Sequence, residues 1–295
     1  MKKYLYLLFF FVSFTYSFGQ NLSNDNFIYT AAPQKAVQAA NYYTLTKADL
    51  IQTVTYFDGL GRPMQSIAIA QGGNSTNPED IVTYMEYDAF GRQVKEYLPY
   101  AFTNAGNEYL KTAALTATNG FYNTLKYENT VNPFSEKSLE SSPLNRVLQQ
   151  AASGNDWAMA NNHTIKLEYQ TNIANDVKLY LVALSFANNT YTPTLTVSTA
   201  NGGFYSPNEL YKTITKDENW SASDLNNKTT EEFKDKEGRV VLKRTFNNGA
   251  HDTYYIYDIY GNLTFVLPPK AEGLTDIATL NNLSYQYTYD YRNRL

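Results

Sequence analysis

The sequence predicts a mainly β fold of antiparallel hairpins that form part of a repeat sheet, with a minor helical segment. A short motif recurs in five places, each with an Asp followed three residues later by Gly or Asn. Residues beside the motif alternate as in strands, and Tyr255 and Tyr257 fall on one sheet face. Tyr, which favours strands, occurs 27 times. A short unit that repeats indicates a repeated supersecondary structure.

Each copy of the motif predicts a tight turn between two strands. An Asp at the first turn position accepts hydrogen bonds from the backbone ahead of it, and Gly or Asn at the last position tolerates positive φ. Arg follows in four copies and Asn262 in the other. The turn residues are Asp58, Gly61 and Arg62; Asp88, Gly91 and Arg92; Asp235, Gly238 and Arg239; Asp258 and Gly261; and Asp290, Asn293 and Arg294. Stacked hairpins of this kind form a continuous sheet.

The Asp and Arg of the motif have two interpretations. They are either a catalytic or ligand-binding pair, or a turn Asp with an Arg that pairs with it or stacks on a neighbouring Tyr. A catalytic pair is normally needed once per site, whereas this pair recurs along the chain. The structural interpretation is therefore favoured.

The string from Val54 to Ser66 resembles the RHS/YD-repeat family, in particular the N-terminal part of its Bacteroidota members, where an uncharacterised domain precedes YD repeats. Residues 210–213, 217–220 and 261–269 are similar to the same family, and the resemblance covers nearly all of the mature chain. It implies a hollow shell of repeats that can enclose a C-terminal toxin domain used in interbacterial competition. Five repeats cannot close a shell, so the chain is expected to be the N-terminal piece of a longer protein or a truncated product.

Residues 1–19 are expected to be a cleavable signal peptide. Two lysines precede an apolar run, and the small residues Ser17 and Gly19 stand where a signal peptidase cuts, before Gln20. The alternative is a transmembrane anchor, for which the run is short. The prediction is a secreted or cell-surface protein with no membrane segment in its mature form.

The remaining chain is predicted to have three parts. Residues 20–160 form an N-terminal domain with two YD-like repeats, residues 161–230 a β-rich insert, and residues 231–295 further YD repeats that are truncated at the C-terminus. A helix is expected within 104–127, where several apolar residues share one helical face.

Composition excludes several classes of function. There is no Cys, which excludes disulfides and thiolate metal sites, and the net charge of −4 gives no basic footprint for nucleic acid. The two histidines, His163 and His251, are far apart in sequence, and no spacing matches a known metal or cofactor motif. No catalytic residue, metal or cofactor is therefore predicted.

The expected function is a non-catalytic, secreted structural module of an RHS-type shell, whose partners are further repeats and a toxin domain. A cell-surface module that binds glycan or protein is the alternative, because of the many tyrosines. An enzyme that acts on polysaccharide is a third hypothesis.

Overall fold

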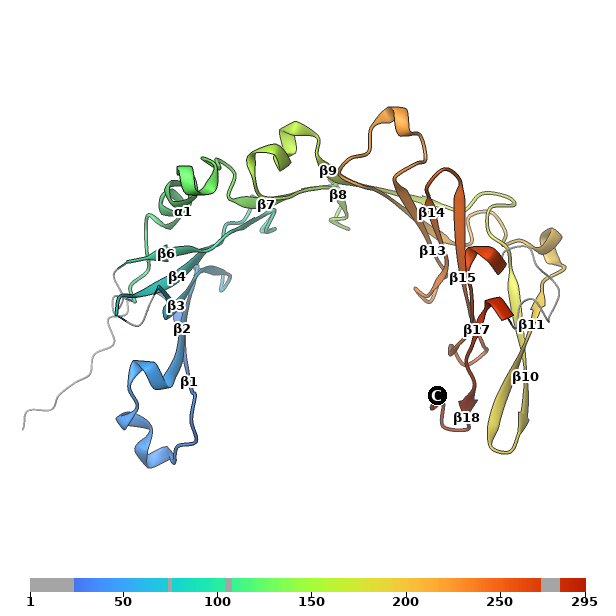
Figure 1. Cartoon of the computed structure of the whole chain (residues 1–295), viewed down its shortest axis with the longest axis horizontal. Coiled ribbons are helices and arrows are strands. Elements are labelled where there is room, and N and C mark those ends of the chain that lie inside the picture. The colour runs from blue at the N-terminus through green and yellow to red at the C-terminus, as the bar shows by residue number, and fades with distance from the viewer. Residues whose placement is uncertain (1–23, 74–75, 104–107, 272–281) are drawn as a thin grey trace, which may run out of the picture. The chain divides into compact units, whose positions relative to one another are not determined.

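The computed structural model describes residues 24–73, 76–103, 108–271 and 282–295. The predicted signal peptide, residues 1–19, lies outside the described residues. The described chain is mainly β, with antiparallel strand pairs and a short helix, which confirms the predicted fold class. It divides into two compact units (Figure 1): unit 1 comprises Met1–Tyr87 and Tyr97–Pro133, and unit 2 comprises Asp88–Glu96 and Phe134–Leu295.

Unit 1 contains an antiparallel sheet with the strand order β1-β2-β3-β4-β6. Its strands are β1 (Phe27–Pro33), β2 (Leu50–Phe57), β3 (Pro63–Gly73), β4 (Pro78–Tyr84) and β6 (Tyr100–Phe102). Helix α1 (Ala114–Tyr122) packs against β4 and β6, and the 3-10 helices are η1 (Ala39–Thr44), η2 (Lys47–Asp49) and η3 (Leu125–Tyr127). Alternate residues of β2 and β3 are buried, among them Val54, Tyr56 and Ile67. They form one buried cluster that also includes Ala114 of α1.

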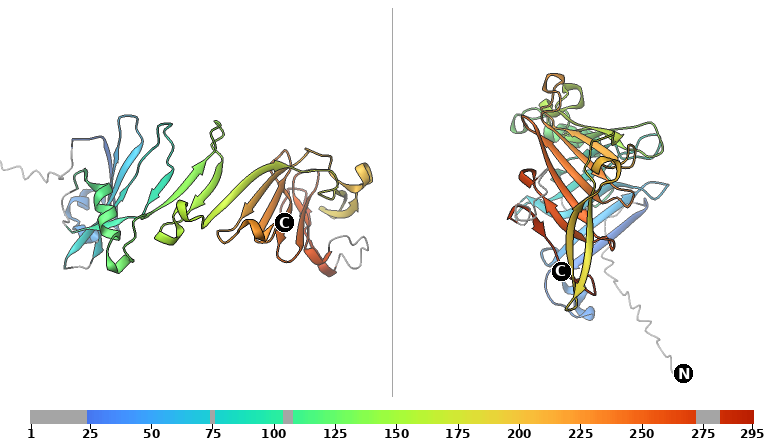
Figure 2. Two further views of the ribbon diagram at one scale, coloured as in Figure 1. Left: turned by 90° about the horizontal axis from the view of Figure 1, so that it is seen from above. Right: turned by 90° about the vertical axis from the view of Figure 1, so that its right-hand side faces the viewer.

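Unit 2 contains a longer antiparallel sheet with the order β17-β16-β15-β14-β13-β12-β9-β8-β7-β5. The strands are β5 (Lys95–Tyr97), where the division between the units falls, β7 (Phe134–Leu139), β8 (Val147–Ala151), β9 (Thr164–Thr171), β12 (Tyr211–Lys216), β13 (Thr229–Lys234), β14 (Val240–Phe246), β15 (Ala250–Tyr257), β16 (Leu263–Leu267) and β17 (Tyr285–Gln286). Figure 2 shows the later strands, from yellow-green to red, side by side in this order.

A second sheet of unit 2 has the order β10-β11-β18, from β10 (Tyr180–Ala187), β11 (Thr190–Val197) and β18 (Tyr289–Asp290). β10 and β11 form a long ribbon (yellow in Figure 1). The ribbon residue Tyr180 joins Phe233, Leu242 and Leu267 of the long sheet in one buried cluster. The 3-10 helices of unit 2 are η4 (Asn155–Trp157), η5 (Met159–Asn161), η6 (Ala200–Gly203), η7 (Ala222–Asp224) and η8 (Pro269–Ala271).

Strands from the predicted insert and from the predicted later repeats belong to one sheet. β9 and β12, both within residues 161–230, pair with each other, and β12 also pairs with β13, which starts at Thr229. The domain boundaries at 20, 160 and 230 stay predictions. Within the described part of the chain, no helix is long and apolar enough to span a membrane.

Candidate functional site

The repeat turns share one hydrogen-bond pattern, which the first copy shows in full. The Asp58 N–H donates to the Arg62 carbonyl at 2.9 Å, and the Gly61 N–H donates to the Asp58 carbonyl at 3.0 Å. Asp58 Oδ1 accepts the N–H groups of Leu60 and Arg62, both at 2.9 Å. Asp58 Oδ2 accepts Arg62 Nε at 2.8 Å and Nη2 at 2.7 Å. Gly61 has a φ of +77°, a conformation that glycine adopts without steric cost.

The other copies reproduce this geometry. The N–H of each turn Asp donates to the carbonyl four residues later at 2.9–3.0 Å, in the turns that begin at Asp88, Asp235, Asp258 and Asp290. Gly91, Gly238 and Gly261 have φ values of +78°, +80° and +82°, and Asn293 has +55°. At Asp58, Asp235 and Asp258, the strand register shifts immediately before the Asp, as in a β-bulge. The structure thus places each predicted group of turn residues together in one turn. The turns at Asp58, Asp235 and Asp258 connect two paired strands, as predicted. The turn at Asp88 instead lies between β4 and β5, which belong to different sheets, and in the described chain no strand follows the turn at Asp290.

Hydrogen bonds within the turns lower the pKa of the Asp58, Asp88 and Asp290 carboxyls. The pKa of Asp58 is lowered first by the Arg62 backbone N–H, although desolvation partly opposes it, and then by the Arg62 side chain. Asp88 has the same sequence of causes with Arg92. The pKa of Asp290 falls from its ordinary 3.8 to about 2, through the backbone and then the side chain of Arg294. These carboxylates are ionised at neutral pH and are committed to their own turns.

A tyrosine from the chain that follows bonds each of four hairpins, β2–β3, β7–β8, β13–β14 and β15–β16. Its hydroxyl donates to the carbonyl of the residue directly after the Arg or Asn that ends the turn. Tyr87 donates to Pro63 at 2.9 Å, Tyr169 to Val147 at 2.9 Å, Tyr257 to Val240 at 3.1 Å, and Tyr289 to Leu263 at 2.9 Å. We call these four bonds the tyrosine links. Tyr87, Tyr257 and Tyr289 are the aromatic residues directly before a motif Asp, which gives that position a physical role: it binds the preceding hairpin. Tyr169 makes the same bond but is not followed by an Asp.

The turn arginines also lie over the tyrosine rings. The guanidinium carbon of Arg62 is 4.4 Å from the ring centroid of Tyr87, and that of Arg239 is 5.1 Å from the centroid of Tyr257. This is cation–π geometry. Each of these two arginines is therefore held by its own Asp on one side and by the linking tyrosine on the other.

Two predicted arginines lie differently. Arg92 lies over Phe90 of its own turn at 5.0 Å, and its Nη1 donates to Asn145 Oδ1 at 2.9 Å. Arg294 pairs with Asp290, but its side chain is 67% exposed. In the fourth turn, Asn262 Nδ2 donates to Asp258 Oδ2 and to Asn293 Oδ1, both at 3.2 Å. An amide therefore replaces the cation there and joins two successive turns.

The β7–β8 hairpin contains a turn of the same kind that the sequence reasoning missed. The Glu140 N–H donates to the Arg146 carbonyl at 2.9 Å, and Arg146 Nη2 lies 2.8 Å from Glu140 Oε2. Asn145 has a φ of +52°, and Arg146 lies 4.6 Å from the Tyr169 ring centroid. The repeat motif has an Asp and a fixed spacing, whereas this turn has a Glu and two extra residues. The Asn-Arg pair, as in Asn293-Arg294, is the signal that could have found it.

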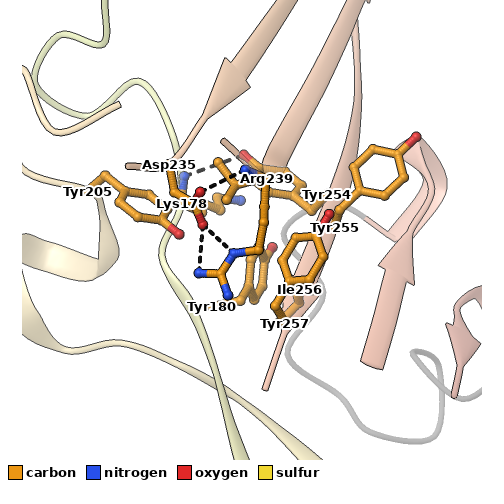
Figure 3. Close-up of a pocket in the computed structure, with 10 residues that line it drawn as sticks. Lys178, Tyr180, Tyr205, Asp235, Arg239, Tyr254, Tyr255, Ile256 and Tyr257 are labelled. Atoms are coloured by element: carbon orange, nitrogen blue, oxygen red, sulfur yellow. Dashed lines mark hydrogen bonds and ion pairs between the residues drawn. The ribbon is translucent and has the colours of Figure 1, made fainter. Parts of the chain in front are cut away.

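The Asp235–Arg239 pair lines a small pocket of unit 2 (Figure 3). Tyr180, Tyr205 and Tyr257 surround the pair, and the cavity volume is about 60 Å³. Burial, together with the nearby Asp235 carboxylate, raises the pKa of Tyr205 to about 12. Sites for small organic ligands usually measure about 300–1,000 Å³. The pocket is therefore of a size for ordered water rather than for a sugar or cofactor.

A buried charge cluster in unit 2 lies apart from the repeat turns. Arg244 binds Asp252 through two bonds of 2.7 and 2.8 Å and Asp176 at 2.8 Å. Lys212 binds Glu231 at 2.7 Å. Desolvation lowers the pKa of Arg244, but its bonds to Asp252 and Asp176 outweigh this and raise the pKa overall. The cluster ties the segment before the β10–β11 ribbon to the long sheet.

The two histidines have separate surroundings. The His163 ring makes an edge contact with Trp157, with centroids 5.7 Å apart, and His251 Nε2 lies 3.1 Å from the Asn247 carbonyl oxygen. In the residues that the structure describes, no group of three or more His, Cys, Asp or Glu side chains is arranged to hold a metal ion.

Comparison with known proteins gives one family match and several similar structures. Residues 29–171 match a family model described as a domain of unknown function, DUF6443. The match includes the turns at Asp58 and Asp88 and the missed turn at Glu140, and it ends at the end of β9. No curated protein matches.

Two of the similar solved structures cover most of this chain. One is the crystal structure of TcdB2-TccC3 without its hypervariable C-terminal region, at 19% identity, TM-score 0.42 and 81% coverage of this chain. The other is a mutant Tc holotoxin pore of Photorhabdus luminescens, at 18% identity, TM-score 0.41 and 82% coverage. The chain spans 10% of the length of each.

Proposed function

We propose that the chain is a non-catalytic structural repeat module, the N-terminal part of an RHS-type shell protein. The tyrosine links carry this proposal, because each bonds a hairpin to the chain segment that follows it, through Tyr87, Tyr169, Tyr257 or Tyr289. A contact that recurs along the sheets suits a wall that is extended by adding hairpins.

The use of the turn carboxylates supports a role without catalysis. In the first turn, Oδ1 of Asp58 accepts two backbone N–H groups and Oδ2 accepts the Arg62 guanidinium. Asp88 and Asp290 make the same set of bonds. A general base must be free to take a proton from a substrate. These carboxylates instead accept hydrogen bonds that shape the turn.

The sequence resemblance to the RHS/YD-repeat family, of the Bacteroidota type, supports the rest of the proposal. On this proposal the protein is secreted or displayed on the cell surface, after removal of residues 1–19. Its partners are further repeats and a C-terminal toxin domain, which the assembled shell encloses for use in interbacterial competition.

An immunoblot of producing cells with an antibody against residues 20–295 tests this proposal. Medium, surface and cytoplasmic fractions are compared, with protease treatment of intact cells to reveal surface protein. We expect an exported band far above 33.5 kDa, the mass of the present chain. A cytoplasmic protein would contradict the export, and a finished product near 33.5 kDa would contradict the shell. Turnover by the purified chain that a single substitution abolishes would contradict the absence of catalysis.

A second candidate function is a surface module that binds glycan. It is favoured by an open groove of about 380 Å³ in unit 2, which lies outside the repeat turns and is lined by Trp157 among other residues.

A further inference from the structure

The open groove of unit 2 has the dimensions and lining of a small-molecule site. Its volume of about 380 Å³ lies within the range of about 300–1,000 Å³ that is usual for such sites. Its lining comes from β7, β8 and β9, from the β8–β9 connection and from the loop after β12. The lining residues are Ser135, Gln150, Ala151, Ala152, Ser153, Trp157, His163, Ile165 and Glu218.

Backbone geometry places an aromatic ring at this groove. Trp157 ends the 3-10 helix η4 and is 39% exposed, although tryptophan is among the most apolar side chains. His163 contacts it edge-on, with an angle of 74° between the rings. Gly154 precedes η4 with a φ of +111°, and a Cβ there would lie only 3.3 Å from Trp157 Cδ1. The glycine therefore leaves room for the indole at the groove.

The polar lining side chains are available to a ligand. Ser135, Gln150, Ser153, His163 and Glu218 make no side-chain hydrogen bond or ion pair with any other residue that the structure describes. This contrasts with the repeat turns, where each carboxylate is fully committed. An apolar surface with a few convergent polar groups is the usual composition of a ligand site.

We propose that this groove binds a neutral pyranose unit of a glycan. A pyranose ring has an apolar C–H face that can lie on the indole of Trp157, and its rim of hydroxyl groups both donates and accepts hydrogen bonds. The Glu218 carboxylate accepts from hydroxyls, while the serines, Gln150 and the His163 ring can donate or accept. This matches the mixed lining of the groove.

The charges and the strand pairing argue against two other ligands. No Lys or Arg lines the groove, and Glu218 carries a negative charge, so an anionic sugar or a phosphate is disfavoured. A peptide added as an extra strand needs a free sheet edge. β8 pairs with both β7 and β9, and β9 also pairs with β12, so the floor strands offer no such edge.

Tryptophan fluorescence and calorimetry on the full chain test the proposal. The sequence has two tryptophans, so Trp220→Phe leaves Trp157 as the reporter. The probes are cellohexaose, xylohexaose and mannohexaose, with hexagalacturonate as the anionic control. We expect at least one neutral hexasaccharide to bind and to change the Trp157 emission, and hexagalacturonate to bind more weakly.

Substitutions localise the site. Trp157→Ala should weaken binding by about tenfold or more, whereas the matched variant Trp220→Phe should leave it unchanged. Glu218→Gln, which keeps the size of the side chain, should weaken binding by a smaller factor and serves as the test if Trp157→Ala does not fold.

Three results would overturn the site: no binding of any neutral hexasaccharide at millimolar concentration, unchanged affinity in both Trp157→Ala and Glu218→Gln, or stronger binding of hexagalacturonate. None of these results bears on the tyrosine links, so the structural role and the glycan site can fail separately.

Discussion

Two sets of ion pairs in unit 2 contrast with each other: those of the repeat turns and those of the cluster around Arg244. In the β13–β14 turn, Asp235 and Arg239 are neighbours in sequence, and the Arg239 side chain is 34% exposed. In the cluster, Asp252 is 2% exposed and Arg244 15%, and Arg244 bonds Asp176, which is 68 residues away. The turn pairs shape the chain locally, whereas the cluster joins distant segments.

The contrast shows what each kind of ion pair contributes. An ion pair near the surface has a small net energy, because water screens it. The turn carboxylates stabilise the turn mainly by accepting hydrogen bonds from backbone N–H groups. In the buried cluster, each charge has lost its water and depends on its partners. Loss of one partner should therefore cost far more in the cluster than in a turn.

The largest effect is expected from Arg244→Met, which leaves Asp252 buried without its cation. Removal of one partner from a buried pair typically costs about 3–5 kcal/mol. We expect the free energy of unfolding to fall by about that amount, as measured by urea denaturation at pH 7. The double variant Arg244→Met/Asp252→Leu should be less destabilised than the single one, since no orphaned charge remains at position 252. A double variant that is more destabilised would contradict this explanation.

Backbone strain in a turn should have the next largest effect. Gly238 has a φ of +80°, which costs a residue with a Cβ about 1–2 kcal/mol. Gly238→Ala should lower the free energy of unfolding by that amount. The chain itself supplies the matched control, because Asn293 occupies the same place in the last turn at +55°. Gly238→Asn should therefore cost less than Gly238→Ala, and equal losses would count against the role of the left-handed position.

A single tyrosine link should contribute less. Tyr257→Phe removes the hydroxyl that donates to the Val240 carbonyl but keeps the ring beneath Arg239. A net loss of about 1 kcal/mol is expected, which is typical of one hydrogen bond. Denaturation of Tyr211→Phe is the control, because Tyr211 is 64% exposed. Amide hydrogen exchange near Val240 should become faster in Tyr257→Phe and not in Tyr211→Phe. Equal stability and equal exchange in the two variants would show that the tyrosine links do not stabilise the fold.

The part of the fold that the sequence predicted is the part set by local contacts. An Asp, a residue with positive φ and flanking alternation lie within ten residues of one another, so the hairpins follow from neighbouring side chains. The turn at Glu140 was not predicted, because it reaches the same geometry with a longer loop and with a Glu in place of the Asp. What matters there is a carboxylate, a left-handed residue and an arginine, not their spacing.

Non-local features were not predictable in this way. Arg244, Asp176 and Asp252 stand in unremarkable strands or loops, and only the pairing of β14 with β15 and the path of the preceding segment bring them together. The groove at Trp157 likewise combines three strands with the loop that carries Glu218. The tyrosine links fall between these cases: the tyrosines are evident in the sequence, but their acceptors are backbone carbonyls on a neighbouring strand.

The smallest effects are expected from pH, and they separate the two kinds of turn. The pKa of Glu140 falls from its ordinary 4.5 to about 2, chiefly through the side chain of Arg146, and that of Asp290 falls from 3.8 to about 2, chiefly through the backbone of Arg294. A carboxyl whose pKa is lower in the folded state stabilises the fold above its unfolded pKa. That contribution is lost as the pH falls through the folded pKa, so both carboxylates stabilise at neutral pH and cease to do so between about pH 4.5 and 2.

Replacement of each arginine should distinguish the two turns in an NMR titration of the carboxyl carbons. Arg146→Gln should return the pKa of Glu140 most of the way to its ordinary value, because the main donor is gone. Arg294→Gln should leave the pKa of Asp290 lowered, because the backbone N–H groups of Arg292 and of residue 294 still donate to Oδ1. If Asp290 instead titrates at its ordinary value in Arg294→Gln, then the charge of the arginine, and not the turn backbone, lowers the pKa of Asp290. The repeat turns would then resemble the Arg244 cluster more closely than their hydrogen bonds suggest.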